Sequence, residues 1–103
     1  MRDNIYYNKD GKIIAKGKSH KRVLVGKWIY YVYDGPIMVN VETYNFKNGI
    51  KDGPYYRSHL GGYTRGKFKN NYKSGNWKFY DHKGQLIEEK KYRKGELIKK
   101  SKI

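Results

Sequence analysis

The chain has 103 residues, of which 24 are lysine or arginine and nine are aspartate or glutamate, giving a formal net charge of +15, and it contains no cysteine. This length suits one domain, and the lack of cysteine excludes a disulfide framework and a thiolate metal site and agrees with a cytoplasmic location. No apolar run reaches the roughly 20 residues of a membrane-spanning helix, and Met1 leads into Arg2-Asp3-Asn4, so we expect neither a transmembrane segment nor an export signal.

Alternating side chains predict strands along most of the chain. The pattern is clearest at residues 28–33, where Trp28, Tyr30 and Val32 would share one face, and at residues 77–80. Turn signals separate such stretches, at residues 8–11, 34–36, 48–49, 61–62 and 81–84. Asn or Asp first and Gly fourth suits a type I turn closed by a residue at positive φ. The sequence therefore predicts an all-β fold, an elongated antiparallel meander of about eight to ten short strands built from hairpin repeats.

Aromatic rings must form most of the core of such a sheet. They make up 17% of the chain, with twelve tyrosines, while aliphatic residues are scarce. Each ring can bury roughly 150–250 Å² of surface.

One phrase occurs twice in the middle of the chain. Residues 46–55 read FKNGIKDGPY and residues 68–77 read FKNNYKSGNW, an offset of 22 residues from Phe46 to Phe68. Tracing this unit outward predicts one repeat domain over residues 1–103, with degenerate units at about 1–25, 26–52, 53–74 and 75–103. Residues 18–25 fit this pattern poorly, and we interpret them as an insertion.

The phrase Gly-x-Trp-x-x-Tyr, followed by a turn glycine and an aromatic-Lys-Asn-Gly element, resembles the MORN repeat. More narrowly, it is similar to the MORN-variant repeats of bacterial YwqK-family antitoxins, with the best match over residues 68–98. Asn71 stands where the family has glycine, and Tyr55 where it has tryptophan. The resemblance implies β-hairpins used as interaction scaffolds, for which protein binding, lipid binding and toxin neutralisation have been proposed. The matching residues are scaffold positions, so the resemblance implies a fold more than a function.

The residues favour a protein that is not an enzyme. His20, His59 and His82 stand apart beside basic or turn residues, and no phosphate-cradling glycine motif occurs. Glu88 and Glu89 are neighbours, so on a strand they would point to opposite faces and more simply neutralise cross-strand lysines. We therefore expect no catalytic residue, no metal site, no cofactor and no small-molecule substrate.

The cations gather in three blocks, at residues 11–33, 53–80 and 90–103, and the first two blocks contain no acid. Alternation would place Lys67 and Lys69 opposite Phe68, and Lys78 opposite Trp77, so packing of the rings would leave a lysine-lined face. The candidate nucleic-acid-binding residues are Lys16, Lys18, Lys21, Arg22, Lys27, Arg57, Arg65, Lys67, Lys69, Lys73, Lys78, Lys90, Lys91 and Arg93.

A basic sheet face with nearby rings predicts a small binding module for an anionic macromolecule, RNA before DNA, read by charge and shape. Nineteen of the 24 cations are lysine, which suits phosphate attraction without base recognition. The candidate stacking rings are Tyr6, Tyr7, Tyr31, Tyr33, Tyr56, Tyr63 and Tyr80, and the alternative for each is a core or cross-strand ring. The lysines could also simply solubilise the sheet and protect its edges.

Two further function classes stay open on the sequence. The first is a protein-protein inhibitor, either antitoxin-like or a phage or mobile-element protein that blocks a host defence nuclease, possibly through the guide RNA of that nuclease. The second is binding to an anionic membrane, which polybasic segments favour, although no amphipathic helix is evident. In each case we expect a cytoplasmic monomer or a dimer paired through strand edges.

Overall fold

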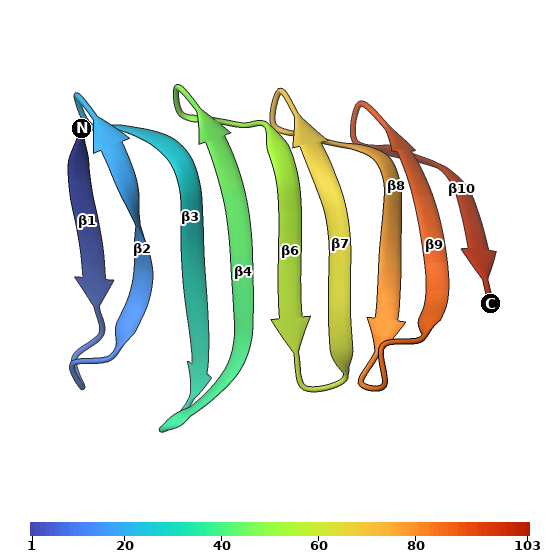
Figure 1. Cartoon of the computed structure of the whole chain (residues 1–103), viewed down its shortest axis with the longest axis horizontal. Helices are drawn as coiled ribbons and strands as arrows, with labels where there is room; N and C mark the ends of the chain where they lie inside the picture. Colours follow the sequence, from blue (N-terminus) through green and yellow to red (C-terminus); the bar gives the residue numbers. More distant parts are fainter.

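All ten strands of the protein belong to one antiparallel sheet, and no helix is present (Figure 1). The computed structural model describes residues 1–103. The strands are β1 (Arg2–Tyr7), β2 (Ile13–His20), β3 (Val23–Asp34), β4 (Ile37–Lys47), β5 (Ile50–Lys51), β6 (Gly53–His59), β7 (Gly62–Lys69), β8 (Tyr72–Asp81), β9 (Leu86–Arg93) and β10 (Glu96–Lys102). Their spatial order follows the chain, with the two-residue β5 paired to β4 outside the main path. The predicted all-β meander is confirmed.

The sheet is a single layer with two broad faces. Nine strands spaced by about 4.8 Å would span roughly 38 Å, which agrees with the longest dimension of 40 Å, while the shortest is 17 Å. Only seven of the 103 residues are buried. Because directly paired residues of an antiparallel sheet share a face, the strand registers assign side chains to one face or the other.

One face carries a continuous run of aromatic rings, and we call it the tryptophan face. Neighbouring ring centroids lie 4.9 to 6.3 Å apart from β1 to β9. Such contacts each contribute roughly 0.5–1.5 kcal/mol beyond the area they bury. They therefore replace the aliphatic core that the composition lacks. The rings are Tyr6, Trp28, Tyr30, Tyr44, Phe46, Tyr55, Phe68, Trp77 and Tyr92.

Each tryptophan lies flat over a glycine of the neighbouring strand. A Cβ atom on Gly17 would lie 2.2 Å from the Trp28 ring, and one on Gly66 would lie 2.2 Å from the Trp77 ring. The indole Nε1 of Trp28 donates to the Lys18 carbonyl at 2.9 Å. Both indoles are almost completely buried, with 2% of Trp28 and 3% of Trp77 exposed. Because glycine has no side chain, the indole ring can lie directly against the backbone at these two positions.

This arrangement occurs twice, 49 residues apart. Trp28 and Trp77 have the same distance in sequence as Gly17 and Gly66. The indole of Trp77 likewise donates to the carbonyl of Lys67, at 3.2 Å. In both halves the strand that carries the tryptophan has two more residues than its partner strand opposite the glycine. In the first half, Lys16 pairs with Ile29 and Lys18 pairs with Val25. One residue therefore lies between the two pairs on β2, and three residues lie between them on β3.

Residues 18–25 belong to this pattern, so they are not an insertion relative to the second half of the chain. They form the end of β2, a two-residue turn and the start of β3, at the place that residues 67–74 occupy in the second half. The turn consists of Lys21 and Arg22, both at positive φ. Because neither is Gly or Asn, the usual turn signal is missing.

Four two-residue turns of this kind join strands at one end of the sheet, the end at the top of Figure 1. We call this row of strand ends the type I′ edge. Both residues of each turn have positive φ, which is the signature of a type I′ hairpin turn. The turns are Lys21-Arg22, Asn48-Gly49, Asn70-Asn71 and Lys94-Gly95. Successive turns are linked, since Gly49 N donates to Leu24 O (2.8 Å), Asn71 N to Lys51 O (2.9 Å) and Gly95 N to Lys73 O (3.0 Å). This shared turn environment accounts for the repeated phrase.

The opposite edge has the predicted type I turns at two places. Gly11 N donates to Asn8 O and Gly84 N to Asp81 O, both at 3.0 Å, and both glycines have positive φ. The Asn8 side chain accepts from two backbone amides of its turn, and so does Asp81. The predicted role of Asx residues at these positions is confirmed.

Candidate nucleic-acid interface

The face opposite the tryptophan face is strongly basic, and we call it the lysine face. It carries eleven cations and three carboxylates, whereas the tryptophan face carries seven cations and four carboxylates, and the remaining charges lie in turns. The three carboxylates are Asp3, Glu89 and Glu96. The cations of the lysine face are Lys16, Lys18, Lys27, Lys47, Arg65, Lys67, Lys69, Lys78, Lys91, Arg93 and Lys99.

Nine of the fourteen predicted site residues lie on the lysine face. They are Lys16, Lys18, Lys27, Arg65, Lys67, Lys69, Lys78, Lys91 and Arg93. Eight of the nine are exposed, and Lys16 is half-buried. Lys21 and Arg22 form the first turn of the type I′ edge, where they line a hollow together with Tyr6 and Ser19 of the tryptophan face. The two-residue alternation therefore collects most of the predicted site on one surface.

Arg57, Lys73 and Lys90 lie on the tryptophan face, apart from the other predicted site residues. The Lys73 ammonium is 4.9 Å from the Trp77 ring and 5.1 Å from the Tyr92 ring. The Lys90 ammonium is 5.0 Å from the Phe79 ring. Such cation-π contacts are favourable, so these two lysines help to cover the aromatic rings.

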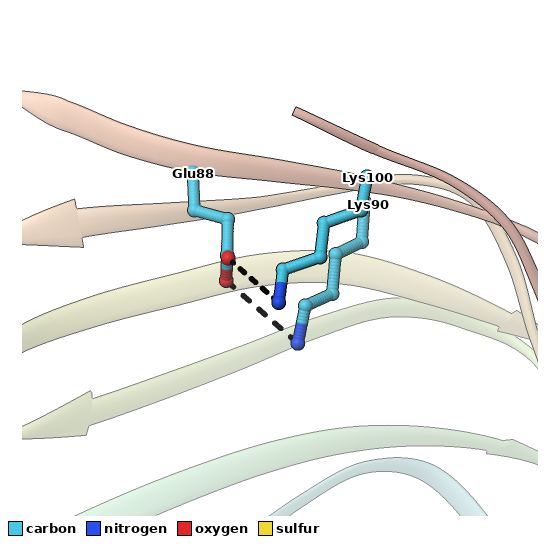
Figure 2. Close-up of polar contacts among 3 residues, drawn as sticks. All are labelled: Glu88, Lys90 and Lys100. Carbon is cyan, nitrogen blue, oxygen red and sulfur yellow. Dashed lines mark ion pairs between the residues drawn. The ribbon is translucent and has the colours of Figure 1, made fainter. Parts of the chain in front are cut away.

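Both ion pairs of the structure involve Glu88 on the tryptophan face (Figure 2). Its carboxylate lies 3.7 Å from Lys90 Nζ and 3.6 Å from Lys100 Nζ on the neighbouring strand. The expectation that Glu88 neutralises a cross-strand lysine is confirmed. On the lysine face, Glu89 is the register partner of Lys78 and Asp3 that of Lys18, yet neither forms an ion pair. The cations of this face are therefore available to an external anion.

Two shallow basic hollows on the lysine face are related by the 49-residue repeat. The first has a volume of about 550 Å³ and is lined by three cations, Lys16, Lys18 and Lys27, and by one carboxylate, that of Asp3. The second has a volume of about 450 Å³ and is lined by Arg65, Lys67 and Lys78 among others. They lie behind Gly17 and Gly66, the glycines that the two indoles cover on the other face. Four strand spacings separate β2 from β7, so the hollows are roughly 19 Å apart.

Tyrosine rings accompany the cations. Tyr63 stacks on Tyr80 with centroids 4.6 Å apart and lies 5.9 Å from Tyr56. The Arg65 guanidinium is 5.7 Å from the rings of both Tyr56 and Tyr63. These rings partly cover one another, whereas Tyr7 is 57% exposed.

Of the seven candidate stacking rings, Tyr6 lies on the wrong face. It is the register partner of Ala15, which pairs with Tyr30, and its ring stacks on Trp28 with centroids 6.3 Å apart. Tyr6 thus belongs to the ring core. Tyr72, which is not among the candidate stacking rings, is 57% exposed and pairs with Lys69 on the lysine face. The odd spacing between Tyr72 and Trp77 is the signal that could have placed it there.

The tyrosines with perturbed ionisation lie away from the lysine face. Burial raises the pKa of Tyr55 to about 12, and the nearby Glu42 carboxylate adds to this effect. Burial also raises the pKa of Tyr44, whose hydroxyl donates to Glu42 Oε2 at 2.7 Å. Raised values keep both phenols neutral and protonated, so they act as hydrogen-bonding members of the ring core.

No group of three or more His, Asp or Glu side chains is placed to hold a metal ion. The structure contains no helix that could cross a membrane. Comparison of the chain with family models, curated proteins and solved structures finds no match. The relation to MORN-variant repeats therefore stays a prediction from the residues quoted above.

Proposed function

We propose that this protein is a small non-enzymatic module that binds single-stranded nucleic acid, RNA before DNA, on its lysine face. The observation that carries the proposal is the collection of eleven cations, none in an ion pair, on one face of a single-layer sheet. Such a density of like charge costs self-repulsion. A polyanion would remove that cost when it binds.

The placement of the two basic hollows suggests how a single-stranded nucleic acid lies on the β-sheet. They are equivalent sites in the two 49-residue halves and lie along the long dimension of the molecule. A nucleic-acid strand that crosses the sheet from β2 to β7 would place phosphates in both hollows and pass Tyr56 on β6 between them. It would then meet Tyr63 on β7 and Tyr80 on β8 at the second hollow. Contacts of this kind read charge and shape, since lysine does not form the bidentate base contacts of arginine.

A titration of a fluorescently labelled single-stranded RNA at several salt concentrations tests the proposal. We expect affinity to fall steeply with salt, with a slope of about −0.7 per phosphate contacted. The variant Arg65→Gln/Lys67→Gln/Lys78→Gln should reduce the magnitude of the slope by about 2 and weaken binding at low salt by about tenfold or more. Duplex RNA and single-stranded DNA of the same sequence complete the comparison.

The matched control removes three exposed cations elsewhere, as Lys9→Gln/Lys83→Gln/Lys102→Gln. Lys9 and Lys83 lie in the two turns that Gly11 and Gly84 close, and Lys102 lies on the tryptophan face. Both variants have the same net charge, so a specific face predicts unequal losses. Equal losses, or no binding to any strand at low salt, would contradict the proposal. Binding to anionic vesicles in place of strands would favour the membrane function instead.

A further inference from the structure

A third hollow on the lysine face lies at the type I′ edge in the second half of the chain. It has a volume of about 430 Å³, within the range of small-molecule sites. Four cations line it, from the end of β7, from β9 and from the last turn, and no carboxylate is among its lining residues. The cations are Lys69, Lys91, Arg93 and Lys94.

An exposed ring forms part of the same hollow. Tyr72 is 57% exposed and begins β8 directly after the Asn70-Asn71 turn. Its ring packs against Gly95, where a Cβ atom would lie 3.0 Å from Tyr72 Cδ1. The ring is thus supported on one side by the next turn and open on the other. Ser74 adds a hydroxyl group to the lining.

The first half of the chain provides an internal comparison. Tyr72 corresponds to Val23 and Lys69 to His20, each 49 residues earlier. Lys91 pairs with Asn76, whose counterpart Lys27 pairs with Asn45, so Asn45 stands in the place of Lys91. The scaffold is therefore the same in both halves, while the ring and these two cations are specific to the second. Side chains that the scaffold does not need point to a ligand.

We propose that this hollow binds a phosphorylated nucleotide, with the phosphate among Lys69, Lys91, Arg93 and Lys94 and the base against Tyr72. A phosphate monoester carries nearly two negative charges at neutral pH and accepts several charge-assisted hydrogen bonds. An aromatic ring beside it supplies a stacking surface for any base. The terminal nucleotide of a bound strand and a free mononucleotide share this chemistry. The first source rests on the proposed function, and the second does not.

Strands of one sequence with a 5′-phosphate, a 3′-phosphate or no terminal phosphate test the first source. We expect one of the phosphorylated strands to bind about tenfold more tightly than the unphosphorylated strand. The variant Tyr72→Val/Lys91→Asn places the residues of the first half in the second, so the fold should accept it. It should reduce this preference to less than twofold. Equal affinity of the wild-type protein for all three strands would overturn binding of a strand end.

A nuclear magnetic resonance titration with AMP, adenosine and inorganic phosphate tests the hollow independently of strand binding. We expect AMP to shift the amide signals of Tyr72, Ser74 and Gly95 at lower concentration than adenosine or phosphate does. These shifts should disappear in Tyr72→Val/Lys91→Asn. Absence of shifts with millimolar AMP, together with equal strand affinities, would overturn the proposal. Failure of all strands to bind while AMP still shifts these signals would overturn the proposed function alone.

Discussion

Single residues decide how the rings of this sheet pack. Gly17 and Gly66 are the clearest cases, because each lies beneath an indole ring that occupies the space of a side chain. The two tryptophans are the largest buried side chains of a molecule that buries only seven residues. Loss of either contact therefore removes a large part of the core.

We predict that Gly66→Ala destabilises the protein by about 1–3 kcal/mol, the usual cost of overpacking. The new methyl group would lie 2.2 Å from the Trp77 ring and would displace the indole from its hydrogen bond to Lys67. Gly61→Ala is the control, because its closest neighbour lies 3.6 Å away, and we expect a change within about 0.5 kcal/mol. Urea unfolding followed by tryptophan fluorescence measures both, and equal stability of the two variants would contradict this packing.

Because the pKa of Tyr55 is raised, we predict that the protein loses stability at alkaline pH. This pKa is raised to about 12 in the folded protein from an ordinary value of 10.0, so above pH 10 the unfolded chain loses this proton first. The folded state then holds more protons than the unfolded state, and the free energy of unfolding falls as the pH rises from about 10 to about 12.

The variant Tyr55→Phe isolates this contribution. Phenylalanine has no phenol proton to lose at this position, and every other ionisable side chain is retained, so the stability of the variant should fall less over the same pH range. Urea midpoints at a series of pH values measure the difference. Parallel decline of the two proteins would show that the Tyr55 phenol does not ionise differently on folding.

At the scale of elements, the sequence predicted strands and most turns but not every turn type. Period-two alternation placed Trp28 and Tyr30 correctly, because each strand has chemically different faces. The Asn8 and Asp81 turns were predictable because their side chains bond to their own backbone. The Lys21-Arg22 turn was not, since those residues carry no turn preference and are held there by the neighbouring strands.

The Lys21-Arg22 turn offers a site for a stabilising substitution. Lys21 and Arg22 have φ values of 50° and 67°, and left-handed conformations cost roughly 1 kcal/mol for each residue other than glycine. Lys21→Asn/Arg22→Gly introduces the residues that type I′ turns favour. We expect a gain of about 1–2 kcal/mol, seen as a melting temperature higher by about 4–8 °C for each kcal/mol. An unchanged melting temperature would mean that the turn is not strained.

The same substitution removes two predicted site cations. If Lys21 and Arg22 contact the bound nucleic acid, the stabilised variant should bind that nucleic acid more weakly. Residues at functional sites often keep a strained backbone conformation at a cost in stability.

The candidate interface could be predicted from the two-residue alternation for the cations within β-strands. Arg57, Lys73 and Lys90 are the exceptions, because each is an even number of residues from a ring of the tryptophan face.

At the scale of the whole molecule, one repeat produces two unlike faces. The rings of one face stabilise a sheet that has no second layer, and the excess of positive charge lies on the other face. The 49-residue period places equivalent basic hollows along the long dimension. The repeated phrase at an offset of 22 residues predicted neither this period nor the hollows.

Lysine acetylation footprinting with and without a bound single-stranded RNA shows which face of the sheet the RNA covers. We expect protection of Lys18, Lys67, Lys78 and Lys91 on the lysine face. We expect unchanged reactivity of Lys100 and Lys102, which are exposed on the tryptophan face. Protection of Lys100 and Lys102 to the same degree, or of these two alone, would contradict binding on the lysine face.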